Sequence, residues 1–293
     1  MIGAMTDRSP QNPQSFNAVL WWFRIIIGLQ SIGIAGRYVF ASNETDIYGL
    51  LFFDHGWPES WAQQIDDAGA FACGVIAIIL ISNGLVSSLQ SARNPDASRS
   101  RISIFVDVVS LVFIAGWTFL LAAAHAVRGE LFAELALGEI AVRMATPVAM
   151  IFLLLNGHLW RNRRIPAATI ILVISAAITF AIHGYKALQQ YGPFTDLILL
   201  TDQQIFQFGV EQDRAERDLI WIGRLDIGVA VVLLATRWQL VAGYMIVWGF
   251  ITAARRMTAF GVEAWPDTLI RAANWGAPLL LLFLLRANSR QKI

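Results

Sequence analysis

The feature that most constrains this chain is a series of apolar runs, each roughly 17–25 residues long. A helix needs about 20 mostly apolar residues to cross the hydrocarbon core of a bilayer. Of the 293 residues, 56% are hydrophobic and only 15% are charged, whereas about 25% charged residues is usual for a soluble domain. We therefore expect an all-α integral membrane protein, with the lipid bilayer as its first partner.

The runs predict eight transmembrane helices. They lie at 18–37, 68–90, 102–127, 140–160, 165–188, 218–236, 238–257 and 270–287. The polar tail 1–17 precedes them, and the first run continues to Gly36-Arg37 and contains Arg24, so we expect a retained span rather than a signal peptide. The two spans that meet at Trp238 are predicted to be joined by only a very short turn.

The longest connections, 38–67 and 189–217, mix apolar and acidic residues. Their apolar stretches, 48–53 and 197–200, are too short to span a bilayer. We expect these loops to lie along the interface or to dip into it as lids. This hypothesis fails if labels at Leu51 and Leu199 report free aqueous loops.

Lys and Arg gather on one predicted side of the membrane, and most acids on the other. The basic side holds Arg8, Arg93, Arg99, Arg101, Arg161, Arg163, Arg164, Arg237, Arg286, Arg290 and Lys292, accompanied by Asp7 and Asp96. Because cytoplasmic loops carry the excess of Lys and Arg, both termini are predicted to be cytoplasmic in a cell inner membrane.

Short patterns recur in the same order and divide the chain into two predicted four-helix halves, 18–164 and 165–293. The matches are Thr45-Asp46-Ile47 with Thr195-Asp196-Leu197, Asp67-x-Gly69 with Asp226-x-Gly228, Glu139-x-x-x-Arg143 with Asp267-x-x-x-Arg271, and Pro147 with Pro278. Four spans return the chain to its starting side, so the two halves form a parallel repeat.

The second half resembles the DoxX-like group of four-helix membrane proteins, with polar residues at outer helix ends and an Arg followed by a Pro-initiated run. Phe23-Arg24-Ile25-x-x-Gly28 and the loop Phe53-Asp54-His55-Gly56-Trp57-Pro58-x-Ser60 also resemble the related HTTM group, which includes vitamin K-dependent carboxylases. The resemblance implies an association with oxidoreductase or quinone-linked membrane complexes, often as an accessory subunit.

Ionisable residues inside spans are costly in lipid, so they usually pair, face the bundle interior or line a wet cavity. Most of them, with Arg255 and Arg256 among them, fall near the predicted outer side, where we expect a polar pocket. The candidate ligand-binding residues are Asp67, Arg143, His183, Lys186, Arg224, Asp226 and Arg271. The competing interpretation is structural: Glu139 with Arg143, and Asp267 with Arg271, would form i,i+4 ion pairs that only fix helix packing.

Three further expectations concern single side chains. Arg224 and Asp226 are two residues apart, so they point to different faces of a helix and need other partners. Lys186 could act as a base together with His183, or simply extend to the interface. Arg24 and Asp107 lie near the cytoplasmic ends of two spans and are predicted to pair as a structural lock.

Several chemistries are disfavoured. The four histidines, His55, His125, His158 and His183, stand in separate segments without a metal-binding box, so no metal site and no bis-histidine haem is expected. Cys73 is the only cysteine, which excludes a dithiol pair within the chain. No basic domain suggests nucleic-acid binding.

Three classes of function remain open. The first is an accessory protein that binds a quinone or another amphipathic molecule in the outer pocket, in partnership with membrane-complex subunits. The second is a small-molecule transporter that rocks its two halves. The third is a membrane enzyme distantly related to the carboxylases, with Lys186 or His183 as base.

Overall fold

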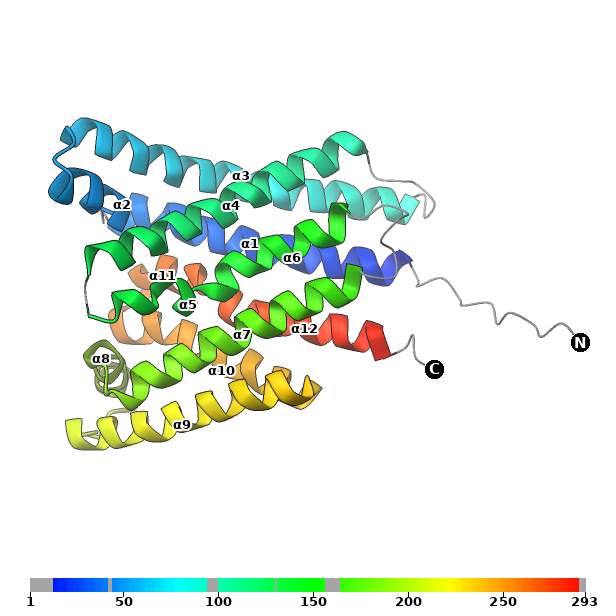
Figure 1. The fold of residues 1–293 in the computed structure, drawn as a ribbon. Helices are drawn as coiled ribbons and strands as arrows, with labels where there is room; N and C mark the ends of the chain where they lie inside the picture. The colour runs from blue at the N-terminus through cyan, green and yellow to red at the C-terminus, as the bar shows by residue number, and fades with distance from the viewer. Residues whose placement is uncertain (1–12, 42–43, 94–99, 130, 156–163, 290–293) are drawn as a thin grey trace, which may run out of the picture.

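A computed structural model describes the chain except residues 1–12, 42–43, 94–99, 130, 156–163 and 290–293 (Figure 1). The described part is helical and contains no strand. Arg8, Arg99, Arg161, Arg163, Arg290 and Lys292, with Asp7, Asp96 and His158, lie outside the described residues. The all-α class predicted from the apolar runs is thus confirmed for the described chain.

The first part of the chain forms four long helices and a set of short ones. In order they are α1 (Pro13–Ala41), α2 (Asp46–Gly49), the π-helix η1 (Leu50–Asp54), α3 (Glu59–Arg93), α4 (Arg101–Arg128), the 3₁₀ helix η2 (Ala133–Leu135), α5 (Ala136–Glu139) and α6 (Ala141–Leu155).

The second part follows with α7 (Arg164–Leu188), α8 (Gly192–Thr201), the π-helix η4 (Asp202–Phe206), α9 (Gln212–Thr236), α10 (Gln239–Phe260), the 3₁₀ helix η5 (Val262–Ala264), α11 (Trp265–Ile270) and α12 (Ala272–Ser289). The short turn predicted at Trp238 is present, because Arg237 ends α9 in the left-handed region, at φ 51°.

Within the described residues, six helices are long and apolar enough to cross a membrane, and a seventh is added if the bent pair of 262–270 and 272–286 counts as one span. The predicted span 238–257 forms the helix α10 but is not among them. Arg255 and Arg256 near the end of this helix lower its apolar character. The chain is therefore a multi-pass membrane protein with six or seven qualifying spans.

The long helices pack as a single bundle (Figure 1). In the first part α1 packs on α3 and α4 on α6, and in the second α7 packs on α9 and α10 on α12. Contacts of α6 with α7, and of α1 with α11 and α12, join the two parts. One apolar core runs through both, with members such as Phe23, Ile114, Leu153, Leu172 and Leu281.

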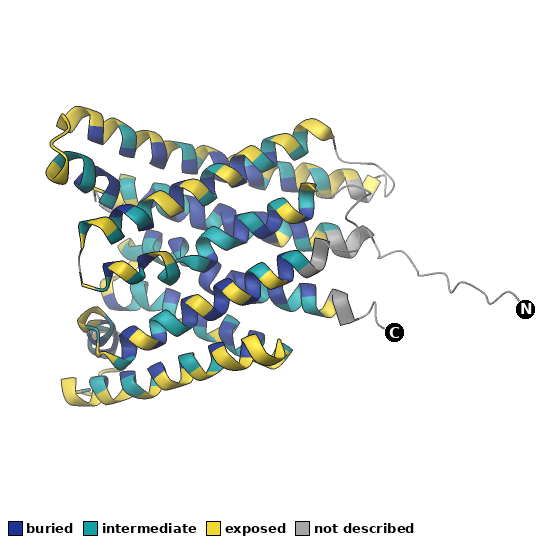
Figure 2. Cartoon of the chain, viewed as in Figure 1, coloured by how far each residue is buried: buried dark blue, intermediate teal, exposed yellow. Residues whose placement is uncertain are grey.

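Large apolar side chains are also exposed on the outside of the bundle, where Figure 2 colours many residues of the outer helices as exposed. Phe71 and Ile78 on α3 are 75% and 68% exposed. A soluble protein rarely exposes a contiguous apolar surface of this kind. A belt of such side chains fits contact with lipid tails.

The lock predicted between Arg24 and Asp107 is present. The Arg24 guanidinium donates to the Asp107 carboxylate, and both side chains are 1% exposed. Asn83 of α3 donates a second bond to the same carboxylate, at 3.0 Å. These contacts tie α1, α3 and α4 together inside the bundle.

The helices that close each part are broken. Ile140 interrupts the helix between α5 and α6, and Arg271 does the same between α11 and α12. At the first break, Thr179 of α7 provides hydrogen-bond partners for the freed backbone groups. Its hydroxyl donates to the carbonyl of Gly138 and accepts from the N–H of Val142. Freed backbone groups need such partners in a membrane.

The break at Ile140 corrects one prediction. Because the chain leaves helical geometry between Glu139 and Arg143, their side chains do not form the expected i,i+4 ion pair. Glu139 is bound by Lys186 instead. The other predicted pair, Asp267 with Arg271, does form, at 3.7 Å.

We call the end of the bundle that carries α2, η1, α5, α8, η4 and α11 the distal end; the first residues of α1 and the last of α12 lie at the opposite end (Figure 1). The described residues of the loops 38–67 and 189–217 include short helices of the distal end, α2 with η1 in the first loop and α8 with η4 in the second. Leu51 and Leu199 are half-buried and pack against apolar clusters. Whether either loop enters a membrane stays a hypothesis.

Asp202 holds the second of these loops together. Its carboxylate accepts the backbone N–H groups of Phe208 at 3.0 Å and Val210 at 2.9 Å. The Val210 bond is the largest cause that lowers the pKa of Asp202 below its ordinary value, and the Phe208 and Gly209 bonds add to it. The charged carboxylate therefore stabilises the loop.

This arrangement predicts a pH dependence. A lowered pKa means that the loop is stabilised above the ordinary aspartate pKa, and that this stabilisation is lost as the pH falls through the lowered value. Asp202→Asn is expected to raise hydrogen exchange at Phe208 and Val210 already at neutral pH. The exposed Asp196→Asn is the control; equal exchange in the two variants contradicts the prediction.

Candidate functional site

A cavity of about 90 Å³ lies toward the distal end, between α7, α8, α9, α10 and α12. One part of its wall is apolar, formed by Phe180, Ala187, Phe194, Leu197, Leu219, Ile222 and Trp248. The polar part is formed by Thr179, His183, Asp226, Thr252, Arg255, Arg256, Arg271 and Asn274. With about 30 Å³ per water molecule, the cavity can hold a small polar head group but not a long molecule.

Arginine dominates the polar part of this cavity. Arg255 and Arg256 come from the last turns of α10, and Arg271 from the break before α12. The break turns the Arg271 guanidinium back onto the preceding turn, where it donates to the carbonyl of Asp267 at 2.7 Å. Within the described chain, neither Arg255 nor Arg256 has a carboxylate within 4 Å, and the Nε of Arg256 is buried without a partner.

Arg143 lies in a second layer beside the cavity. It does not line the cavity, but it interacts electrostatically with Arg256 and Arg271. Its Nε is also buried without a partner, while Gln30 of α1 donates to its backbone carbonyl at 3.2 Å. Three arginines from α6, α10 and the α11–α12 break thus approach one another inside the bundle.

Asp226 stands apart from these cations. It projects from α9, is 5% exposed, and its Oδ1 is buried without a hydrogen-bond partner. Asn274 of α12 likewise has a buried Oδ1 without a partner. Unpaired acceptors of this kind are costly in a low-dielectric interior, so they mark this cavity as a site rather than as ordinary packing.

His183 connects the cavity to a partly buried ion pair. Its Nδ1 lies 2.8 Å from the carbonyl of Thr179, which can only accept, so this nitrogen carries the proton. Its Nε2 faces Glu139 at 3.8 Å. The same Glu139 accepts a hydrogen bond of 2.6 Å from Lys186.

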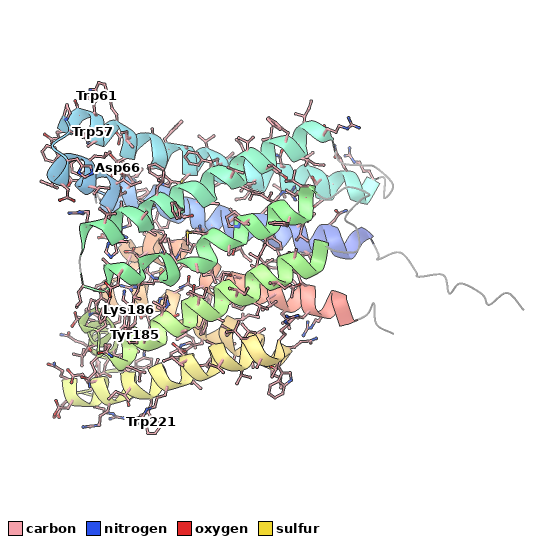
Figure 3. The ribbon with its side chains drawn as sticks, in the orientation of Figure 1. Trp57, Trp61, Asp66, Tyr185, Lys186 and Trp221 are labelled. Atoms are coloured by element: carbon pink, nitrogen blue, oxygen red, sulfur yellow. The ribbon has the colours of Figure 1, made fainter. Side chains whose placement is uncertain are left out.

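Lys186 does not extend to the interface, contrary to one of its two predicted roles. Its side chain is 4% exposed, and its Nζ lies 4.7 Å from the centre of the Tyr191 ring (Figure 3). The base role is not supported either: Lys186 donates to Glu139 and does not line the cavity. Sequence alone did not show that α5 brings a carboxylate to this lysine.

The structure thus brings together only part of the predicted site. His183, Asp226 and Arg271 line the cavity, and Arg143 and Lys186 lie beside it. The other two candidates, Asp67 and Arg224, lie elsewhere.

Asp67 is exposed on α3, where the Tyr38 hydroxyl donates to it. Its buried neighbour Asp66 (Figure 3) binds Thr45 and thereby fixes the start of α2. Arg224 is exposed on α9, 4.8 Å from the ring of Trp221, which points away from the bundle in Figure 3. Neither Asp67 nor Arg224 contributes to the cavity.

Arg255 and Arg256, which the sequence placed among the ionisable residues near the outer side, line the cavity. Sequence reasoning missed Trp248 and Asn274, because a single Trp or Asn in an apolar helix does not reveal which cavity it faces.

A larger, more open hollow of about 540 Å³ lies at the opposite end, along the α9–α10 turn and α12. It includes Arg237, Trp238 and Arg286, but none of its described side-chain atoms is buried without a partner. Among the described residues no group of three or more His, Cys, Asp or Glu side chains is arranged to hold a metal ion. The arginine-lined cavity is therefore the stronger candidate.

Comparison with known proteins adds no assignment: no family model, no curated protein and no solved structure matches the chain. The resemblance to the DoxX-like and HTTM groups stays a prediction.

Proposed function

We propose that the chain binds the polar head of an amphipathic molecule in the arginine-lined cavity. The observation that carries this proposal is the division of the cavity wall, with Phe194, Leu197 and Leu219 on the apolar part and Arg255, Arg256 and Arg271 on the polar part. A head group meets the arginines, and its tail leaves the cavity past the apolar part of the wall. A quinone is one such molecule.

The proposal includes the wider architecture. We infer eight spans, with α10 as one of them because it has 22 residues and packs along α12. We infer a parallel duplication, since long helices, a short helix with a π-helix, and a broken last helix occur in the same order twice. Both termini are cytoplasmic in this proposal, in a cell inner membrane, and the cavity opens toward the outer side.

The register of the inferred duplication differs from one pairing suggested by the sequence. Aligning the breaks at Ile140 and Arg271 also aligns Pro147 with Pro278, each in the helix that follows. Asn274 then aligns with Arg143. In this register Arg271, at the break of the second half, aligns with the apolar Ile140 of the first half. An arginine at the break is therefore a feature of the second half alone.

An accessory role in a membrane redox complex is the biological setting we propose. Within the described chain no group of metal-binding side chains is found, and the base role of Lys186 lacks support in its contacts. A subunit that holds an amphipathic molecule for a catalytic partner needs neither a metal site nor a catalytic base of its own. The alternatives of transporter and carboxylase-related enzyme have no specific observation in their favour.

The experiment is extraction followed by mass spectrometry. The protein purified in a mild neutral detergent is expected to carry a bound amphipathic molecule. Ala187→Phe is expected to remove it, because Ala187 is 1% exposed and lines the cavity. Ile174→Phe on the exposed face of the same helix is the control. Retention of the molecule by Ala187→Phe, or its absence from the native protein, contradicts the proposal.

A further inference from the structure

We propose that the head group is an anion, a carboxylate or a phosphate, held by Arg256 and Arg271 with Arg255. This inference rests on the proposed function and names the chemical class of its ligand. It follows from how the charges around the cavity are shared, from the geometry of guanidinium groups, and from the side chains left without partners.

The carboxylates of Asp267 and Glu139, near the cavity, already form ion pairs with other cations. Asp267 is shared by Arg271 at 3.7 Å and Arg37 at 3.6 Å. Glu139 receives Lys186 at 2.6 Å. In the described chain these two carboxylates therefore serve three cations.

Arg143, Arg255 and Arg256 have no carboxylate within 4 Å among the described residues. Glu139 attracts Arg143, and Asp267 and Glu139 attract Arg256, only from beyond this distance, and both carboxylates are shared with closer cations. An arginine stays protonated in proteins, and an uncompensated charge in a low-dielectric interior is strongly unfavourable. The region thus carries an excess of positive charge that a bound anion would neutralise.

Asp226 does not remove this excess. It also lines the cavity, but its carboxylate forms no ion pair with any described arginine, and one of its oxygens lacks a partner. Its position on α9 suits a donor on the ligand, such as a hydroxyl next to the acidic group. An anion and a neutral donor in one head group would satisfy both sets of side chains.

Arginine is also the side chain best suited to this task. The planar guanidinium presents parallel N–H groups that match the two oxygens of a carboxylate or phosphate. Arg255 and Arg256 are adjacent on α10, and Arg271 approaches from the break before α12, so the cations come from two elements. A neutral quinone would use their N–H groups but leave their charge uncompensated.

The test compares the affinities of compounds that carry different head groups. Binding of dodecyl phosphate, dodecanoate, dodecanol and a short-chain quinone is measured by native mass spectrometry in nanodiscs of neutral lipid. The two anions are expected to bind at least about tenfold more tightly than the neutral compounds, in line with the strength of hydrogen bonds between charged groups. Arg256→Gln and Arg271→Gln are each expected to lose about tenfold or more in anion affinity.

Matched controls separate a binding role from a structural one. Arg224→Gln removes the same charge from an exposed position in the same half and is expected to leave anion binding unchanged. Arg256→Lys keeps the charge, loses the paired geometry and is expected to fall in between. Without ligand, Arg256→Gln should melt at or above the native temperature, whereas removal of a structural ion pair would lower it.

An arm with inorganic phosphate distinguishes the source of the anion. If phosphate alone stabilises the native protein but not Arg256→Gln, the site accepts a free anion; if only the dodecyl compounds bind, the ligand is an amphipathic acid. Equal affinity for dodecanol and dodecyl phosphate, or full affinity in Arg256→Gln and Arg271→Gln, overturns the inference. If only the quinone binds tightly, the proposed function stands and the inference that the head group is an anion is wrong. If nothing binds in any arm, both fall.

Discussion

Replacing Arg24 by Met is expected to lower the free energy of unfolding by about 3–5 kcal/mol, the usual cost of breaking a buried ion pair. The partner Asp107 is 1% exposed, and only Asn83 of α3 would still donate to it. A carboxylate left inside the bundle without its cation has no access to water. The measurement is the melting temperature in detergent, together with the fraction of monodisperse protein after extraction.

A matched control lies on the same helix. Arg37 of α1 also forms an ion pair, 3.6 Å from Asp267, but its side chain is 50% exposed. Exposed pairs contribute about 0–1 kcal/mol, so Arg37→Met is expected to melt close to the native protein. The double variant Arg24→Met/Asp107→Leu should recover most of the loss, since it leaves no unpaired charge. The role assigned to this lock is wrong if Arg24→Met and Arg37→Met melt alike.

This lock could be predicted because both residues stand near the same end of two long apolar runs. Burial of such side chains in lipid is so unfavourable that pairing across helices was the simplest outcome. The long helices were predictable for the same reason, since apolar runs of this length favour one type of element. The turn at Arg237 and Trp238 was located by the end of one run and the beginning of the next.

The site was less predictable, because it depends on where helices break. Nothing in the local sequence marks Ile140 as the residue that separates Glu139 from Arg143. The i,i+4 rule assumes a continuous helix, and it failed here for that reason. Glu139 binds Lys186 instead of Arg143, and Lys186 lies 47 positions after Glu139 in the chain.

The candidate residues of α9 show a second limit. Two positions separate Arg224 and Asp226, and the sequence indicated that they face different directions. It did not indicate which of them faces the cavity. That depends on the rotation of α9 against α7, which is set by the contact between Gly184 and Gly223.

The same contact gives the other prediction of large effect. A Cβ on Gly223 would lie 2.6 Å from the carbonyl oxygen of Gly184 and 2.9 Å from the backbone N of Leu188. Both neighbours are backbone atoms and cannot move aside as a side chain would. Gly223→Ala is therefore expected to push α9 away from α7 and to destabilise the protein by about 3 kcal/mol, the upper part of the range for overpacking.

Gly228→Ala, on the same helix, is the matched control because nothing lies within 4 Å of its added Cβ. Alanine favours a helix over glycine by about 1 kcal/mol, so this variant is expected to melt slightly above the native protein. The two identical substitutions should thus shift the melting temperature in opposite directions.

The consequences of Gly223→Ala should reach the cavity as well. Asp226 follows Gly223 within one turn of α9, and Leu219 precedes it by one turn, so both move with the helix when it is displaced. Retention of an amphipathic ligand should fall in Gly223→Ala and remain native in Gly228→Ala. If both variants melt and bind like the native protein, the close approach of α7 and α9 does not hold Asp226 in place, and the cavity wall on this side must be fixed by other contacts.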